Sequence, residues 1–221
     1  MKNVRIDSYI DFMDTVCQAK LNGFLFRGVV DAKAHDLVPS IGRVTKLKGQ
    51  SLAKITREER HWLKRFRLEG AQYVSGKPDL WEWMALARHH GLPVRLLDWT
   101  RNPLVALYFA VWDNNGTPAA VYAERFSRHI DIESERDPFA IKKIGKFQPP
   151  HSVARIASQS SVFTIHPDPR KPYNSATLHC FEIPAKLVPN MKASLRRCGI
   201  HPASVFPGLG GVAKSLVSGA L

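Results

Sequence analysis

The sequence predicts a single α+β domain with a mixed, mostly antiparallel central sheet and flanking helices. Helical spacing of apolar residues, with capping and stop signals, dominates the first half of the chain. Short alternating runs typical of strands are concentrated in the last third. No internal repeat, low-complexity segment or linker interrupts the 221 residues, so we expect residues 1–221 to share one core.

A helix and then a strand are predicted near the start of the chain. Residues 10–20 carry apolar side chains at approximately helical spacing, and an Asn-Gly pair follows as a stop signal. Residues 24–30 form a short β-rich run in which Arg27 and Gly28 lie inside the strand or at its end. Residues 31–50 are polar, with scattered Pro and Gly, and are predicted to form a loop.

Two helices are predicted next. In residues 56–73, Thr56 and Glu59 match a capping box that would begin a helix. The apolar face of that helix would carry Trp62, Leu63, Phe66 and Tyr73. Residues 80–90 form the second predicted helix, because Asp79 can cap its start and a glycine follows its end.

A strand and a buried helix are predicted in the middle of the chain. Residues 93–98 are apolar apart from one arginine and one aspartate, which favours a strand. Asn102 and Pro103 then supply an N-cap and a proline at the first helical position. The following helix, residues 103–113, is apolar on nearly every side, so we expect it to be buried.

The last third is predicted to be mainly β and then helical. Residues 124–153 give a poor signal. The predicted later elements are strands at 119–123, 161–166 and 176–183, and helices at 189–198 and 207–221.

Positive charge is in excess. Lys and Arg total 32 against 19 Asp and Glu, a formal net charge of +13. A solvated basic surface or an anionic partner would each explain this balance. One predicted helix concentrates basic residues at Arg57, Arg60, Lys64, Arg65 and Arg67. A non-enzymatic nucleic-acid-binding module that uses this helix is therefore one alternative for the protein.

Composition and missing motifs exclude several classes. No apolar run approaches the roughly 18–20 residues of a membrane span, and residues 1–11 show no secretory signal core. Cys17, Cys180 and Cys198 lack metal-ligand spacing, which favours reduced thiols in a cytoplasmic protein without a metal. P-loop, dinucleotide-binding Gly-x-Gly-x-x-Gly, Gly-x-Ser-x-Gly and Cys-x-x-Cys motifs are all absent.

Two groups of polar residues beside the predicted strands could carry chemistry. Arg27 can offer a bidentate fork to a phosphate or carboxylate, and Gly28 would let a ligand approach the backbone. An exposed arginine beside a turn glycine is the alternative. Arg95 and Asp98 flank two leucines, where an unpaired charge is costly, so they serve a ligand or pair with each other or with Arg27. Asp98 or Thr100 could equally cap the next helix.

A third polar group covers residues 155–164. It holds Arg155, Gln159 and several hydroxyl side chains immediately before and into a predicted strand. This composition suits the polar edge of a ligand cleft, and equally a serine-rich turn with a structural glutamine.

Taken together, these groups resemble the FRG domain family, which is named for the Phe-Arg-Gly of its first strand. The resemblance covers nearly the whole chain in order, and its Arg-Leu-Leu-Asp-Trp-Thr block is the specific part. The matching residues are Phe26-Arg27-Gly28, His90-Gly91-Leu92-Pro93, the block from Arg95 to Thr100, residues 102–110, Arg155-Ile156 with Gln159 and Phe163, and Phe206-Pro207-Gly208-Leu209.

A more distant resemblance is to ADP-ribosyltransferases of the arginine–serine–glutamate type. Arg27 matches their first-strand arginine, and residues 106–110 resemble their Ala-x-x-Phe-Ala helix. Asp98-Trp99-Thr100 stands where those enzymes have Ser-Thr-Ser, and Gln159 lies in the region of their glutamate. The resemblance implies an ADP-ribosyltransferase-like fold with NAD as substrate.

The resemblance also implies roles for particular residues. It assigns cofactor binding to Arg27, Gly28, Arg95, Tyr108 and Phe163, and catalysis to His90, Asp98, Thr100 and Gln159. Arg27 would bind the diphosphate, and an aromatic ring of this set would stack on nicotinamide. Asp98 or Gln159 would hydrogen-bond the ribose, and His90 would act as a general base for the acceptor.

The expected function is therefore an NAD-dependent ADP-ribosyltransferase or NAD glycohydrolase. It would act as a bacterial toxin or phage-defence effector on an anionic macromolecule. Besides the nucleic-acid-binding module, a second alternative is a metal-independent ribonuclease that uses His89 or His90 with Arg95. The sequence leaves the acceptor and the oligomeric state open.

Overall fold

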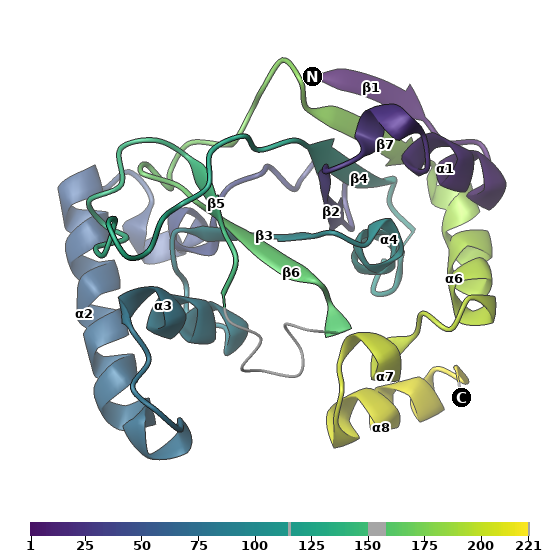
Figure 1. Cartoon of the computed structure of the whole chain (residues 1–221). Coiled ribbons are helices and arrows are strands. Elements are labelled where there is room, and N and C mark those ends of the chain that lie inside the picture. The colour runs from purple at the N-terminus through teal and green to yellow at the C-terminus, as the bar shows by residue number, and fades with distance from the viewer. Residues whose placement is uncertain (115, 150–157, 221) are drawn as a thin grey trace.

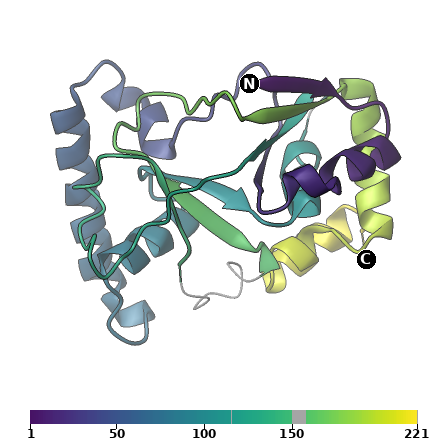
Figure 2. The same ribbon diagram turned by 45° about the horizontal axis from the view of Figure 1, so that its top comes forward.

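A computed structural model describes residues 1–114, 116–149 and 158–220 of the chain (Figures 1 and 2). Its strands are β1 (Lys2–Arg5), β2 (Leu25–Val29), β3 (Leu96–Thr100), β4 (Ala119–Glu124), β5 (Gly145–Phe147), β6 (Ser161–Ile165) and β7 (His179–Ile183). Its α-helices are α1 (Tyr9–Val16), α2 (Leu52–Gly70), α3 (Leu80–His89), α4 (Pro103–Val111), α6 (Val188–Arg197), α7 (Pro202–Val205) and α8 (Leu209–Val217).

The seven strands form one open sheet in the order β1-β7-β4-β2-β3-β6-β5. Every neighbouring pair is antiparallel except β1 with β7, which is parallel. The predicted mixed and mostly antiparallel sheet with flanking helices is therefore confirmed. No helix in the described ranges is both long and apolar enough to cross a membrane.

Two groups of helices cover different halves of the sheet, as Figure 1 shows. On one half, α1, α4 and α6 share an apolar core with β2, β4 and β7. On the other half, α3 packs through Trp81 and Met84 against the strand residues Leu96, Phe163 and Ile165. Leu97 and Trp99 of β3 alternate to the opposite face, where they pack beneath loop residues. The sheet is thus the shared layer between three apolar clusters.

Two predicted helix starts are confirmed by their caps. The Asp79 carboxylate accepts a hydrogen bond from the Glu82 amide at 2.8 Å, and the Glu82 side chain accepts one from the Asp79 amide. The Asn102 side chain accepts from the Leu104 amide, with Pro103 at the first helical position. The helix that follows, α4, is buried along most of its length, as its all-apolar sequence predicts.

The predicted start of the basic helix is wrong. Helix α2 begins at Leu52, and the Ser51 side chain is its N-cap, so Thr56 lies inside the helix. Thr56 and Glu59 bind Arg95 instead of capping a helix end. The helix also ends before Tyr73, whose exposed fraction is 82%.

Other boundaries differ because pairing with neighbouring strands, and not local pattern, decides them. The strand expected at 93–98 is β3, which pairs from Leu96 with Ile165 to Thr100 with Ser161. The sequence missed β1, an exposed edge strand without alternating burial, and the short β5. The expected loop at 31–50 contains two short 3₁₀ turns, Ser40–Arg43 and Thr45–Leu47.

Strands β2 and β3 pair at a single position and then diverge. Their register contains only Phe26 opposite Thr100, whereas β2 pairs with β4 along all five of its residues. Helix α4 packs directly on β2, and a Cβ atom at Gly28 would lie 1.9 Å from the Ala106 carbonyl oxygen. Close helix packing therefore accounts for a glycine at position 28.

Candidate functional site

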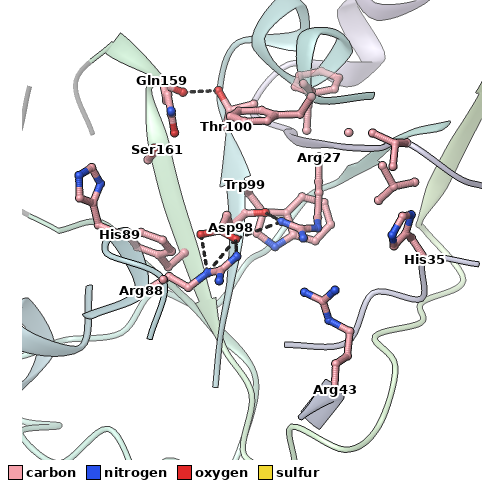
Figure 3. Close-up of a pocket in the computed structure, with 18 of the residues that line it drawn as sticks. Arg27, His35, Arg43, Arg88, His89, Asp98, Trp99, Thr100, Gln159 and Ser161 are labelled. Atoms are coloured by element: carbon pink, nitrogen blue, oxygen red, sulfur yellow. Dashed lines mark hydrogen bonds and ion pairs between the residues drawn. The ribbon is translucent and has the colours of Figure 1, made fainter. Parts of the chain in front are cut away.

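A cavity of about 680 Å³ lies where β2 and β3 diverge, between the end of α3 and helix α4 (Figure 3). This volume is in the range of small-molecule sites. Of the residues predicted for the site, the cavity brings together Arg27, Gly28, His90, Asp98, Thr100, Gln159 and Phe163. The structure thus brings the first-strand arginine together with Asp98, Trp99 and Thr100 of the Arg-Leu-Leu-Asp-Trp-Thr block.

Asp98 is the centre of an ion-pair network in the cavity. The Arg88 guanidinium approaches its carboxylate from α3, with Nε 3.0 Å from both oxygens. Arg27 approaches from β2, and its Nη1 lies 3.3 Å from the same carboxylate and donates to the Asp98 carbonyl oxygen at 2.6 Å. The three side chains therefore connect α3, β3 and β2 across the gap in the sheet, as Figure 3 shows.

The network leaves this part of the cavity positively charged. Burial by itself would raise the pKa of the Asp98 carboxyl, but the Arg88 guanidinium, followed by that of Arg27, outweighs burial and lowers this pKa below its ordinary value. The carboxylate is therefore ionised and shared by two cations. Because one negative charge balances only one of the two guanidinium groups, the network carries a net positive charge.

Unsatisfied donors lie beside this network. The Arg27 Nε is buried and has no hydrogen-bond partner among the described residues. Arg43, which also lines the cavity, forms no ion pair within 4 Å in the described part of the chain. The His35 Nδ1 accepts from the Asp31 amide at 3.2 Å, so a neutral His35 carries its proton on Nε2. Together these groups offer several donors to an anion.

Thr100 and Gln159 lie together, but their hydrogen bonds hold the backbone. The Thr100 hydroxyl donates to the Gln159 carbonyl oxygen at 2.6 Å and accepts from the Asn102 amide at 3.0 Å. The Gln159 side chain donates to the Val205 carbonyl oxygen at 3.1 Å. Thr100 thus supports the start of α4, one of the two roles that the sequence allowed.

The two histidines of the sequence motif lie at the end of α3. Both His89 and His90 line the cavity, with their rings edge to face at 4.8 Å. His90 is the C-cap of α3 and its ring also lies near that of Phe66. Gly91 follows with a φ of +87°, which ends the helix in a conformation that glycine adopts readily.

Arg95 does not contribute to the cavity. Its side chain is only 2% exposed, and its Nε donates to the Glu59 carboxylate of α2 at 2.9 Å. Its guanidinium also packs on the Phe139 ring. Arg95 therefore pairs neither with Asp98 nor with Arg27, and the expected ribonuclease arrangement of Arg95 with His89 or His90 is not formed.

Tyr108 also lies outside the cavity. It is 1% exposed and stacks on Trp112 within the core around α4, with ring centroids 5.0 Å apart. Its neighbour Phe109 lines the cavity instead. The physical reason is helical geometry, since adjacent residues of a helix point about 100° apart. Phe163 from β6 is the second aromatic ring of the predicted set, and it does line the cavity.

Sequence reasoning missed Arg88, Arg43, His35 and Phe109. Arg88 directly precedes the histidine pair, so its position in the last turn of α3 was the one available signal. Arg43 and His35 lie in the segment interpreted as a polar loop, where no local pattern distinguishes them. Arg155 and Ile156 of the predicted motif lie outside the described residues.

A metal site receives no support from the described ranges, in which no group of three His, Cys, Asp or Glu side chains could hold a metal ion. The carboxylates among the described lining residues are Asp36, which is exposed, and Asp98, which is ion-paired. The chemistry that the described cavity offers is therefore mainly the binding of anions and of aromatic rings.

Comparison with known proteins identifies part of the chain. No curated protein and no solved structure matches it. The family model of the FRG domain matches residues 22–117, which include β2, α2, α3, β3 and α4, and with them Arg27, Arg88 and Asp98. An extent of 1–221 for this domain and an ADP-ribosyltransferase-like fold remain predictions. The family resemblance found by this comparison is therefore to the FRG domain, over residues 22–117 of the chain.

Proposed function

We propose that the cavity binds NAD through its diphosphate and supports breakage of the bond between nicotinamide and ribose. The observation that carries the proposal is the group of donors around Arg27. Its buried Nε has no partner among the described residues, and Arg43 and His35 line the same cavity. Charge-assisted hydrogen bonds of this kind bind phosphate oxygens well.

The remaining lining residues support the rest of the dinucleotide. Phe109 and Phe163 offer rings on which a base or nicotinamide can stack. When the glycosidic bond breaks, its electron pair leaves with the nicotinamide nitrogen and positive charge develops on the ribose. The Asp98 carboxylate is the ionised acceptor in the cavity interior, and it also holds Arg27 and Arg88 in place.

The acceptor completes the reaction. Its nucleophile, or that of water, forms the new bond to the ribose carbon and gives up a proton. His89 and His90, at the end of α3, lie where either could accept that proton. With a macromolecular acceptor the protein is an ADP-ribosyltransferase, as expected of a toxin or phage-defence effector. With water it is an NAD glycohydrolase.

Binding is tested first by calorimetry with NAD, ADP-ribose and adenosine. We expect NAD and ADP-ribose to bind, and adenosine, which lacks phosphate, to bind much more weakly. Arg27→Lys and Arg43→Gln should each weaken ADP-ribose binding by about tenfold to a hundredfold. This change in affinity corresponds to the free energy that a hydrogen bond to a charged group contributes. Arg197→Gln, a charge removal on α6 outside the cavity, should leave binding unchanged.

Catalysis is tested by nicotinamide release from NAD, with and without protein and nucleic-acid acceptors. Release by the wild type and its loss in Arg27→Lys would support the whole proposal. ADP-ribose binding without any nicotinamide release would refute the reaction while retaining the phosphate site. A wild type that binds neither NAD nor ADP-ribose would refute both parts.

A further inference from the structure

Helix α2 presents a long outer face to solvent. It lies at the edge of the molecule in Figure 1, on the side opposite α6. Its inner face is buried through Ile55, Glu59 and Leu63, which repeat every four residues. No residue of α2 lines the cavity, so this face is independent of the proposed NAD site.

Arg57, Lys64 and Arg67 define what we call the outer stripe. Arg57 and Lys64 are two helical turns apart and therefore lie on the same line, with Arg67 beside it. All three are exposed, and none forms an ion pair within 4 Å in the described ranges. The stripe thus holds three cations whose charges are not balanced locally.

The acidic residues of the same helix do not cancel the stripe. Glu58 is paired with Lys54 at 2.8 Å, and Glu69 lies 3.6 Å from Arg65. Glu59 is fully buried and bound to Arg95. Every carboxylate of α2 therefore already has its own cation, which leaves the stripe with an excess of positive charge.

We propose that the outer stripe of α2 binds double-stranded DNA through its phosphates, without reading the base sequence. Three cations spread over roughly 15 Å of a straight helix can follow a phosphate backbone. Single strands bind mainly by stacking bases on aromatic rings. The Trp and Phe rings within α2 are poor platforms, because Trp62 is half-buried beneath the Lys46 ammonium group and Phe66 packs edge to face on Trp83.

The test is fluorescence anisotropy of a labelled 20-base-pair duplex of arbitrary sequence, titrated at about 50 to 200 mM salt. For the wild type we expect log K to fall linearly with log salt concentration. The variant Arg57→Gln, Lys64→Gln, Arg67→Gln should reduce the steepness of that slope by about 2 to 3, since each lost phosphate contact contributes about 0.9.

A matched variant separates a local stripe from overall charge. Lys186→Gln, Lys192→Gln, Arg197→Gln removes the same three charges on and beside α6, at the other side of the molecule. It should retain the wild-type slope to within about 1. An equal decrease of the salt slope in the two triple variants would overturn the proposal. A wild-type affinity that does not change with salt concentration would also overturn it. Tighter binding of a single strand of the same sequence would also overturn it. Thermal unfolding of each variant confirms that folding is intact.

Discussion

The Arg27 side chain bridges the point where two neighbouring strands stop pairing. Its Nη1 donates to the Asp98 carbonyl oxygen at 2.6 Å, just beyond the single paired position of Phe26 and Thr100. A guanidinium therefore bonds to a strand carbonyl at the edge of the gap, and the opening beside it becomes a cavity. The first-strand arginine thus supports the gap in the sheet and also contributes to the site within it.

Asp98→Asn should destabilise the fold and leave two positive charges facing each other. Asp98 is 36% exposed and its two arginine partners are 17% and 20% exposed. We therefore expect a loss of about 1 to 2 kcal/mol of unfolding free energy, less than for a fully buried pair. Urea denaturation measures it. The control is Asp137→Asn, which removes the partner of Arg60 in a pair whose side chains are 47% and 41% exposed. It should cost about 0.5 kcal/mol or less, and a cost equal to that of Asp98→Asn would contradict the argument.

Gly28→Ala should be strongly destabilising although the added group is one methyl. The new Cβ would lie 1.9 Å from the Ala106 carbonyl oxygen and 2.6 Å from the Ala110 amide nitrogen, both backbone atoms of α4. Helix and strand would have to separate, at a cost of about 3 kcal/mol or more. The control is Gly210→Ala in α8, where a Cβ would meet nothing within 4 Å. Thermal denaturation should show that variant unchanged or slightly more stable.

The buried pair of Arg95 and Glu59 should stabilise the fold without taking part in ligand binding. Arg95→Gln leaves Glu59, which is 0% exposed, without its cation, and should cost about 3 to 5 kcal/mol of unfolding free energy. The double variant Arg95→Met, Glu59→Met should cost clearly less than the single one, because no buried charge remains. Calorimetry at low temperature should give the double variant wild-type affinity for ADP-ribose. A tenfold loss would place Arg95 in the site after all.

His166 should make the protein sensitive to mild acid. It is 1% exposed, with its Nε2 2.9 Å from the Thr164 hydroxyl, and burial, followed by the nearby Arg27, lowers its pKa from 6.5 to about 4. A histidine whose pKa is lowered in the folded state stabilises the fold at pH values above the pKa that it has in the unfolded chain. This stabilisation is lost as the pH falls from about 6.5 towards 4.

Urea denaturation as a function of pH measures that loss. The wild type should lose roughly 2 kcal/mol of unfolding free energy between about pH 7.5 and 5, a range in which most carboxyl groups stay ionised. His166→Gln keeps a hydrogen-bonding side chain but cannot titrate, so its unfolding free energy should fall less than that of the wild type over that range. The remaining loss comes from groups such as His179, whose pKa is also lowered by burial. A variant with the same pH dependence as the wild type would assign the effect to other groups.

The local sequence pattern was sufficient to predict an element where neighbouring residues alone decide its start and its burial. Asn102 and Pro103 marked the start of α4, and the helix's apolar surface indicated its burial, because capping and burial both depend on neighbouring residues in the chain. Asp79 marked α3 in the same way. The motif residues Arg27 and Asp98 could likewise be selected from sequence, since charged groups within apolar strands require a partner or a ligand.

Partners across the fold could not be predicted in the same way. Arg95 and Asp98 are three residues apart, yet one binds Glu59 of α2 and the other binds Arg88 of α3 and Arg27 of β2. Alternation along β3 and the packing of a different helix near each residue decide which cation pairs with which carboxylate. Which helix packs there does not depend on the residues next to Arg95 and Asp98 in the sequence. The sequence by itself determined the mixed α+β architecture and that charged residues gather beside buried strands. Only the tertiary structure decided which of them face the cavity, because that depends on where β2 and β3 separate and on which helix fills each side.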